Sequence, residues 1–542
     1  MRLTPITLLL IGLGIWVGCG VNEQRQLKAN PPEIIRINRE DTQQIIEGFG
    51  ASDAWRTQFV GEYWPTEKKE AIADLLFSKE FDNKGNPVGI GLSVWRFYIG
   101  AGSKEQGEQS GIANEWRRAP SFLDSDGNWD WGKYKGQNWF LQAAKSRGVE
   151  QFLAFTISPP VHMTKNNKAY SPGGKSLNIK DRKLDDYVDF LVTIIEHFKQ
   201  KGLVFDYLSP VNEPQWDWNE GSQEGTPALN AEIYDFIKLL SDQLDERSLS
   251  TRIVFGEAGD IRFLSGKQEK EKEKRDDQIN VFFNPSSNLY IGNLPNTAHT
   301  ISGHSYWSTW PIQKLISERK KLRNRIQTID PELNYWQSEF CILQKNGDIT
   351  SGGNRDLGID TALYVARVIH FDLTIPNATS WQWWTALSQF NYKDGLIYLD
   401  AGADGVNSID DPAMESLKYD GNYRDSKLLW ALGNYSRFVR PGMKRVSVDN
   451  LSNPGLEYQA EHLMVSAYTD EQQGKLVLVF VNYDEKDRKV KLENLGINLT
   501  IGQNRFISYT TSETQTLDRG KMSADDIGIP ARSVVTLTAN LK

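Results

Sequence analysis

The sequence predicts an α/β fold, a (β/α)8 TIM barrel with an appended antiparallel β-sandwich domain. Three observations lead to this fold class. Eight short runs of β-branched and aromatic residues recur up to about residue 440, and amphipathic helical patterns fill the spaces between them. After about Pro441 the helical patterns stop, and apolar residues alternate with a period of two, which is typical of half-buried strands.

The eight candidate barrel strands are the segments 45–52, 90–100, 150–158, 205–213, 252–258, 299–307, 334–340 and 379–387. The clearest helical patterns between them are 67–77, 134–148, 185–202 and 228–246. This alternation predicts parallel strands joined by right-handed crossovers, and eight such units close into a barrel. The span 45–440 exceeds the roughly 250 residues of a minimal barrel, so long loops are expected to build a binding cleft.

The C-terminal region, 441–542, is expected to be a sandwich without helices of its own. Its candidate strands are 474–484, 488–495, 504–511 and 532–541. The segment 33–44 precedes the barrel and carries a strand at 33–40, which is expected to join the same sandwich. A polar linker at 20–32 comes before it.

The first 19 residues are typical of a secretory signal. They combine an early Arg2, an apolar stretch from Leu8 to Val17 and small residues around Cys19, and the stretch is short for a membrane span. The pattern is similar to a bacterial lipoprotein signal, in which Cys19 is lipidated and becomes the mature N-terminus. Trp16 is unusual in such a signal, so plain secretion or an uncleaved anchor stays open. The protein is expected to be secreted or to be an outer-membrane or cell-surface lipoprotein.

Composition excludes several classes of function. The net charge of −8 and the absence of a concentrated basic patch argue against a nucleic-acid partner. Cys19 and Cys341 are the only cysteines, so neither a disulfide framework nor a Cys-rich zinc site is expected. The six histidines form no H-E-x-x-H motif, and we expect neither a metal nor another cofactor.

Two carboxylates end predicted strands of the barrel. Glu213 closes the fourth strand, in the stretch YLSPVNEPQWDW, and Glu339 closes the seventh. Reactive residues of such barrels lie at the carboxyl ends of the strands, so both side chains are expected on one rim. Two facing carboxylates beside tryptophans suit glycoside hydrolysis, in which one group protonates the leaving oxygen and the other attacks the anomeric carbon. A surface-loop carboxylate is the alternative for Glu213 taken alone.

Other polar residues lie near the ends of predicted strands. Arg96 is flanked by large apolar residues and needs a carboxylate partner, for which Glu339 is the candidate and a structural ion pair elsewhere is the alternative. His304 and Tyr306 are candidates to bond the nucleophile or the sugar, with a satisfied core histidine as the alternative. Asn212 is a candidate to donate to a sugar 2-OH, and turn formation is its alternative role.

Several tryptophans are candidate stacking platforms, because an indole face matches the C–H face of a pyranose. They are Trp55, Trp216, Trp218, Trp383 and Trp384. For each of them core packing is an equal alternative. Cys341 is expected to be a small buried residue, because a cysteine nucleophile needs a positioned base and the sequence indicates none.

A series of motifs resembles glycoside hydrolase family 30 from about residue 33 to residue 542. The motifs are EGFGASDAW, SVWRFYIGAGS, ISPPVHMTKN, SPVNEPQW, GHSYW, WQSEF and LGNYSRFVRPG. The NEP triplet occurs in many barrel glycosidases, whereas YSRFVRPG at 435–442 is far more particular. The resemblance implies a retaining β-glycosidase whose barrel is fused to a β-sandwich built from both chain ends.

The resemblance also implies roles for the matching residues. Glu213 becomes the general acid/base and Glu339 the nucleophile, and their carboxyl groups should lie about 5 to 5.5 Å apart. The groups implied around them are Asn212 at the sugar 2-OH and Arg96, His304 and Tyr306 around the nucleophile. The sequence departs from the family pattern at Ile157 and His162, which shape the substrate pocket and leave the sugar open.

Family substrates include β-1,6-galactan, β-1,6-glucan, glucuronoxylan and glucosylceramide. The stretches GFGASDAW, NEWRRAPSFL and LAFTISPPVHMTKN are similar to bacterial endo-β-1,6-galactanases, which makes this the leading specificity. A β-1,6-glucanase, a glucuronoxylanase and an exo-acting β-glycosidase are alternatives. The expected partner is a β-linked polysaccharide or oligosaccharide, and the expected membrane attachment is a lipid on Cys19. An alternative of another class is a glycan-binding lipoprotein that has lost catalysis.

Overall fold

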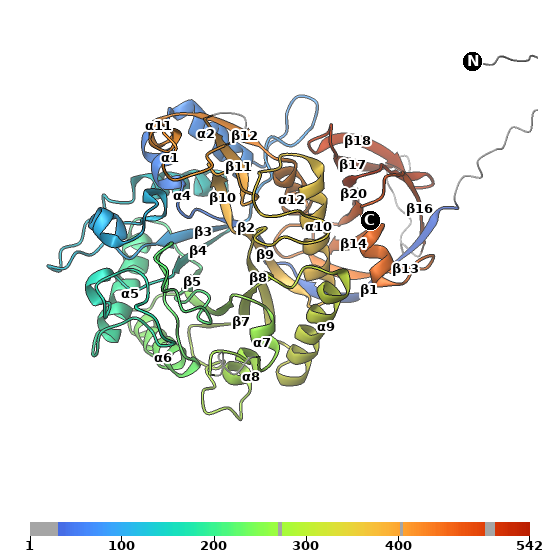
Figure 1. Cartoon of the computed structure of the whole chain (residues 1–542). Coiled ribbons are helices and arrows are strands. Elements are labelled where there is room, and N and C mark those ends of the chain that lie inside the picture. The colour runs from blue at the N-terminus through green and yellow to red at the C-terminus, as the bar shows by residue number, and fades with distance from the viewer. Residues whose placement is uncertain (1–30, 269–273, 402–404, 494–504, 542) are drawn as a thin grey trace, which may run out of the picture.

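The computed structural model describes residues 31–268, 274–401, 405–493 and 505–541. The predicted signal at 1–19, with Cys19, and nearly all of the linker at 20–32 lie outside the described residues. Figure 1 shows a barrel beside a second domain made of strands, and the first described strand belongs to that second domain. None of the helices in these ranges has both the length and the apolar character that crossing a bilayer requires.

Eight parallel strands close into a barrel in the order in which they occur along the chain. They are β2 (Gly48–Ser52), β3 (Val94–Ile99), β4 (Gln151–Thr156), β5 (Tyr207–Ser209), β6 (Arg252–Ala258), β7 (Thr297–His304), β8 (Asn334–Phe340) and β9 (Ala378–Trp383). Each strand overlaps a segment that the sequence predicts, and the predicted barrel is confirmed.

A layer of apolar side chains fills the barrel interior. Six neighbouring strands contribute one residue each: Val94, Leu153, Tyr207, Val254, Ala298 and Trp336. The Tyr207 and Trp336 rings meet edge-on at 4.7 Å between centroids. Packed layers of this kind make the barrel a solid core, so reactive groups are confined to the strand ends.

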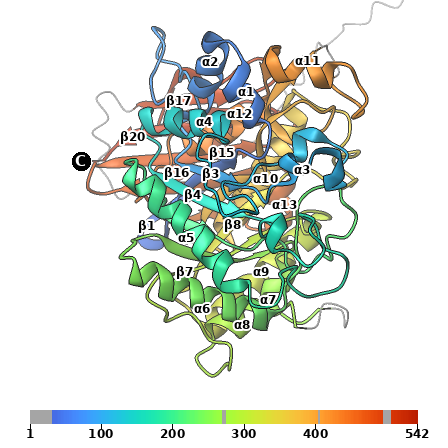
Figure 2. The ribbon, with the colours of Figure 1, turned by 90° about the vertical axis from the view of Figure 1, so that its left-hand side faces the viewer.

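Helices surround the barrel strands (Figure 2). They are α1 (Thr57–Tyr63), α2 (Thr66–Phe77), α3 (Ser103–Gln106), α4 (Lys135–Ser146), α5 (Leu184–Gln200), α6 (Asn230–Glu246), α7 (Arg262–Ser265), α8 (Gln278–Phe283), α9 (Ile312–Ile329), α10 (Ile359–Thr374), α11 (Ala413–Tyr419) and α12 (Lys427–Ser436). Helix α5 illustrates why they form: Val188, Leu191 and Ile195 recur at helical spacing and are buried. Asp185 and Asp186 in its first turn complement the helix dipole.

The second domain is a nine-stranded, mostly antiparallel sheet in the order β18-β17-β20-β15-β14-β13-β1-β16-β19. Its strands are β1 (Glu33–Ile45), β13 (Lys444–Asn450), β14 (Leu463–Asp470), β15 (Lys475–Asn482), β16 (Arg488–Glu493), β17 (Arg505–Thr511), β18 (Asp518–Ser523), β19 (Ile527–Ile529) and β20 (Ser533–Asn540). Strand β1 pairs with β13 and β16, so both ends of the chain contribute. The expectation of a helix-free region is wrong, because α13 (Leu456–Glu461) follows β13.

Helix α12 connects the barrel to this sheet. The buried Asn434 side chain donates to the Thr536 hydroxyl and to the Tyr509 carbonyl, both at 3.0 Å. The Thr536 hydroxyl in turn donates to the Asn434 carbonyl at 2.7 Å. These buried hydrogen bonds link helix α12 to two strands of the sheet and fix the sheet against the barrel. A smaller sheet of β10 (Thr385–Ser388), β11 (Gly395–Asp400) and β12 (Asn422–Asp425) follows β9.

Candidate active site

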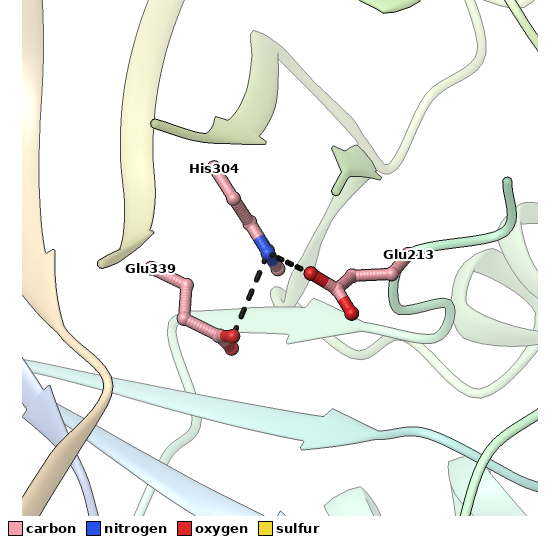
Figure 3. A group of neighbouring side chains, drawn as sticks. All are labelled: Glu213, His304 and Glu339. Carbon is pink, nitrogen blue, oxygen red and sulfur yellow. Dashed lines mark hydrogen bonds and ion pairs between the residues drawn. The ribbon is translucent and has the colours of Figure 1, made fainter. Parts of the chain in front are cut away.

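The carboxyl ends of the barrel strands bring two glutamates together. Glu339 lies one residue before the end of β8, and Glu213 lies in the loop after β5. One carboxylate oxygen of Glu213 is within 4.8 Å of one of Glu339. Figure 3 shows both side chains directed toward the imidazole of His304. Both glutamates line a cavity of about 920 Å³, although they are only 7% and 4% exposed.

The backbone around Glu213 turns sharply. Glu213 has a φ of 44°, a left-handed conformation that is uncommon for a residue with a side chain. Its N–H donates to the Glu257 carbonyl at 2.8 Å, and its own carbonyl accepts from the Trp216 N–H and the Trp218 indole, both at 3.1 Å. Surrounding contacts on both sides hold this conformation, as a strained turn requires.

Three donors surround the Glu339 carboxylate. Arg96 Nη1 lies 3.3 Å from Oε2, and the Tyr306 hydroxyl donates to Oε1 at 3.2 Å. His304 Nδ1 lies 3.5 Å from Oε1. Arg96, fully buried, also donates to the Ser338 carbonyl at 2.9 Å. The expected pairing of Arg96 with Glu339 is therefore present.

His304 links the two glutamates to a third one, Glu257. Its Nδ1 lies 2.9 Å from Glu213 Oε1, and its Nε2 lies 2.9 Å from Glu257 Oε2. Burial lowers the pKa of His304, but the charge of Glu339 and the hydrogen bonds to Glu213 and Glu257 outweigh burial and raise the pKa to about 10. His304 is therefore a cation at neutral pH, and both ring nitrogens donate.

Glu257 is a residue of this site that the sequence analysis missed. It lies at the end of β6 and is 1% exposed. Burial raises its pKa, yet the hydrogen bond from His304 and the charge of Arg96 outweigh burial and lower the pKa to about 2. A signal was present, because Glu257 ends the predicted strand 252–258 just as Glu213 and Glu339 end theirs.

Three groups of the site also have a spacing that a metal ion could use. One atom each of Glu213, His304 and Glu339 lies close enough to the others to hold a cation. A protonated imidazole has no lone pair for a metal ion, so a cation at this position would compete with the proton of His304. Burial raises the pKa of Glu339 above its ordinary value, while the charges of His304 and Arg96 oppose this rise.

Aromatic rings wall the cavity on opposite sides. Trp216 and Trp218 come from the loop after β5, and Trp384 follows β9. Strands β5 and β9 are four strands apart in a closed barrel of eight, so the two groups of indoles face each other across it. Trp216 packs edge-on against Trp307 at 5.5 Å between centroids. These partly exposed rings offer apolar faces to a sugar.

Trp55 and Trp383 lie behind the cavity wall. Their exposed fractions are 1% and 0%. The Trp55 ring packs edge-on against Trp384 at 5.4 Å, and the Trp383 indole donates to the Asp394 carbonyl at 2.7 Å. The expectation that these two rings stack on sugar is wrong, because a buried indole has no free face. Both rings are packed in the core, which is the alternative interpretation given above.

Asn212 and Cys341 also line the cavity. The Asn212 side-chain oxygen is buried and has no hydrogen-bond partner among the described residues, which leaves it for a ligand hydroxyl. Burial raises the pKa of the Cys341 thiol well above its ordinary value, so the thiol stays protonated and is a poor nucleophile.

Loops outside the predicted strands supply further cavity residues that carried no sequence signal. Asp394 lies between β10 and β11, and one of its oxygens is 3.4 Å from Arg56 Nη2. Arg117 lies 5.8 Å from the Trp55 ring centroid and also faces the cavity. Their placement depends on long-range packing, which local patterns do not encode.

This geometry agrees with a comparison to protein families. Residues 32–398 match the model of O-glycosyl hydrolase family 30. The chain therefore belongs to this family of glycoside hydrolases, and the resemblance read from its motifs is confirmed.

Individual proteins and solved structures are also similar to this chain. An endo-β-1,6-galactanase from Hypocrea rufa is 28% identical over 225 residues, which are 38% of this chain and 46% of that protein. The chain thus matches about half the length of this curated relative. A solved structure of a conserved exported protein from Bacteroides fragilis is 37% identical with a TM-score of 0.87, over 94% of this chain and all of that one. The catalytic domain of GH30 xylanase C from Talaromyces cellulolyticus shares the fold at 20% identity and a TM-score of 0.66, over 94% of this chain and all of that one.

Proposed function

We propose that this chain is a retaining β-glycosidase in which Glu339 is the nucleophile and Glu213 the general acid/base. The observation that carries the proposal is the approach of one oxygen of each carboxylate to within 4.8 Å in one cavity. Retaining enzymes hold their carboxyl groups about 5 to 5.5 Å apart, whereas inverting enzymes leave about 6.5 to 9.5 Å for a water molecule. The spacing therefore supports direct attack by a carboxylate on the sugar.

The contacts of the two glutamates support this division of roles. Glu339 faces Arg96, His304 and the Tyr306 hydroxyl, and all three stabilise an anion. Of these three groups, Glu213 contacts His304 alone and lies on a loop beside the cavity. A group that must give and take a proton needs access to the leaving oxygen and to water, and this position supplies it.

The reaction then has two steps. In the first step a Glu339 oxygen forms a bond to the anomeric carbon, the bond to the leaving oxygen breaks, and that oxygen takes the proton of Glu213. In the second step Glu213 removes a proton from water, whose oxygen attacks the anomeric carbon and releases Glu339. One water molecule is consumed, and both glutamates return to their initial states.

For the substrate we propose β-1,6-galactan, cleaved within the chain. The galactanase from Hypocrea rufa is 28% identical over 225 residues, and the motifs in the sequence favour the same specificity. A cavity of about 920 Å³ is at the upper end of the range for small-molecule sites, which suits more than one sugar unit. Indoles on opposite walls provide stacking faces for consecutive residues of the polymer.

The test is hydrolysis by the protein lacking residues 1–19. It would be incubated with β-1,6-galactan, β-1,6-glucan, glucuronoxylan and aryl β-glycosides, and products would be sized over time. Oligomers from galactan, with the β-anomer first in proton NMR, are the expected result. Oligomers from another polymer would reassign the sugar, and monosaccharide alone would favour exo action. If the wild-type protein binds a glycan without hydrolysing it, and Glu339→Gln protein behaves in the same way, the chain is a glycan-binding protein that has lost catalysis.

We also propose that the protein acts outside the cytoplasm, attached to a membrane through a lipid on Cys19. The signal-like pattern at 1–19 supports this, and the similar protein from Bacteroides fragilis is described as exported. Fractionation of cells that express the full chain tests it. Wild-type protein is expected in the membrane fraction, and Cys19→Ser protein is not. If both proteins distribute equally between the fractions, the proposed lipid attachment is contradicted.

A further inference from the structure

Glu257 lies behind the two reacting carboxylates. It is 1% exposed, and among the described residues it is not part of the cavity wall, so a bound sugar does not touch it. Its φ is 39°, a left-handed conformation that costs free energy for a residue with a side chain. Glu213 has the same type of backbone conformation, with a φ of 44°. Backbone strain at a buried carboxylate that does not contact the sugar calls for a functional reason.

Three contacts of Glu257 lead to reacting groups, and a fourth, from its N–H to the Ser302 hydroxyl at 3.2 Å, holds its backbone. Its Oε2 lies 2.9 Å from His304 Nε2 and 3.5 Å from Arg96 Nη2. Its backbone carbonyl accepts the Glu213 N–H at 2.8 Å. His304 contacts both Glu213 and Glu339 through its other nitrogen, and Arg96 contacts Glu339. Glu257 therefore reaches both reacting carboxylates through a single intervening group.

With Glu257 present, the charges of the cluster balance when one carboxyl group is protonated; without it, they balance only when Glu213 and Glu339 are both ionised. Arg96 and His304 are cations, and Glu213, Glu257 and Glu339 are the carboxyl groups. The sum is zero when one carboxyl group holds a proton. A buried cluster favours a net charge of zero, because uncompensated charge is costly away from water. That neutral state is the one that a general acid beside an anionic nucleophile requires.

We propose that Glu257 is a positioning residue that keeps His304 charged and directed at Glu213 and Glu339, and thereby retains the catalytic proton in the cluster. This inference rests on the proposed function. Loss of the Glu257 charge would leave one cation in excess, so the cluster would release its proton more readily. The alkaline limb of the pH profile would then move to lower pH.

The charges of the groups that face His304 support a shift of the alkaline limb to lower pH. These groups are Glu213 from the β5 loop, Glu257 on β6 and Glu339 on β8. Tyr306 donates to Glu339 and stays neutral, because burial raises its pKa well above its ordinary value. Glu257, with a pKa lowered to about 2 by its contacts against the effect of burial, stays anionic over the working range.

The test compares Glu257→Gln with two other variants. Glu257→Asp keeps the charge. Asp260→Asn is a matched control, because Asp260 is equally buried, three residues further along, and pairs with Arg262 at 2.6 Å instead of with the cluster. The measurements are kcat, KM and the pH profile of kcat/KM, with thermal unfolding to confirm the fold.

For Glu257→Gln we expect kcat to fall about 10²-fold, the lower range for general acid–base catalysis, with KM changed less than about threefold. The alkaline limb should move at least about one pH unit lower. Glu257→Asp should keep the limb near its wild-type position, and Asp260→Asn should leave it in place. An alkaline limb that moves equally in Glu257→Gln and Asp260→Asn would overturn the proposal.

A second measurement uses the wild-type protein alone, so it needs no substrate and does not depend on whether a variant folds. NMR of the imidazole nitrogens should show His304 with both ring nitrogens protonated at pH 8. A neutral His304 at that pH would overturn the inference. Because this readout is independent of turnover, failure of the inference and failure of the proposed function are distinguishable.

Discussion

Glu213 and Glu339 come from a loop after β5 and from β8, far apart in sequence, yet a carboxylate oxygen of one lies within 4.8 Å of a carboxylate oxygen of the other. The barrel produces this approach, because the carboxyl ends of all its strands meet at one rim. The two groups have distinct surroundings, on which the proposed division of roles rests. Glu339 faces three donors, and Glu213 faces the cavity.

The first prediction separates the roles of the two glutamates by chemical rescue. Glu339→Ala and Glu213→Ala should each lower turnover of the polymer by about 10²- to 10⁴-fold. With an activated aryl β-glycoside and azide, Glu339→Ala should yield the α-azide, because azide replaces the missing nucleophile. Glu213→Ala should yield the β-azide, because azide replaces water in the second step. Exchange of the two products would reverse the assignment.

The second prediction concerns two tryptophans on and behind the cavity wall. Trp216→Ala removes a partly exposed stacking face, worth about 0.5 to 1.5 kcal/mol, so KM should rise roughly 3- to 10-fold with the fold intact. Trp383→Ala removes a fully buried ring, so the free energy of unfolding should fall by about 3 to 5 kcal/mol. Thermal unfolding and steady-state kinetics measure both. Equal destabilisation by the two substitutions would argue against the placement of Trp216.

The third prediction concerns Gly259, where the chain passes close to the site. A Cβ at this position would lie 2.3 Å from Trp216 Nε1 and 3.1 Å from Glu213 Oε1. Gly259→Ala should therefore displace the Trp216 ring and lower kcat/KM by about 10-fold or more. Gly266→Ala is the matched control, because a Cβ there meets nothing within 4 Å. If both variants keep wild-type kinetics, Trp216 and Glu213 are not as tightly held as the structure shows.

Glu224 underlies a prediction about pH and stability. It is fully buried and accepts hydrogen bonds from Tyr98, Ala101 and Ser103, which fixes the loop after β5 against the end of β3. Burial raises its pKa to about 7, and these hydrogen bonds only partly oppose burial. Because the ordinary value is about 4.3, the unfolded chain ionises first as pH rises.

The contribution of Glu224 to the free energy of unfolding should therefore fall between about pH 4.3 and pH 7, by about 4 kcal/mol, and should stay constant above that range. Glu224→Gln should remove this part of the pH dependence. Denaturant unfolding of both proteins at several pH values measures it. Parallel curves for wild type and Glu224→Gln would show that Glu224 is not the group responsible.

Much of the fold could be predicted because its signals are local. Each barrel strand is a short apolar run, and a carboxylate at the end of such a run predicted both Glu213 and Glu339. The same rule applies to Glu257, which was missed only because no adjacent tryptophan or family motif drew attention to it. The small sheet of β10 to β12 was also missed, since its strands are short and β12 pairs with β11 across the segment that contains α11.

Side-chain exposure could not be predicted from the same signals. Trp383 and Trp384 are adjacent in sequence, and successive residues of an extended segment point to opposite sides. Trp384 accordingly lines the cavity while Trp383 is buried, and no local pattern tells which of the two faces the sugar. Trp55 is buried because it packs in one apolar cluster with Tyr98 and Ile157, which come from segments distant in sequence.

The most direct test of the account is to trap the covalent intermediate. A 2-deoxy-2-fluoro β-galactoside with an activated leaving group slows the second step more than the first, so the glycosyl-enzyme accumulates. Digestion and mass spectrometry then locate the sugar. The account predicts one sugar per chain, esterified to Glu339. A label on Glu213 or Cys341, or inverted product without any labelled enzyme, would contradict it.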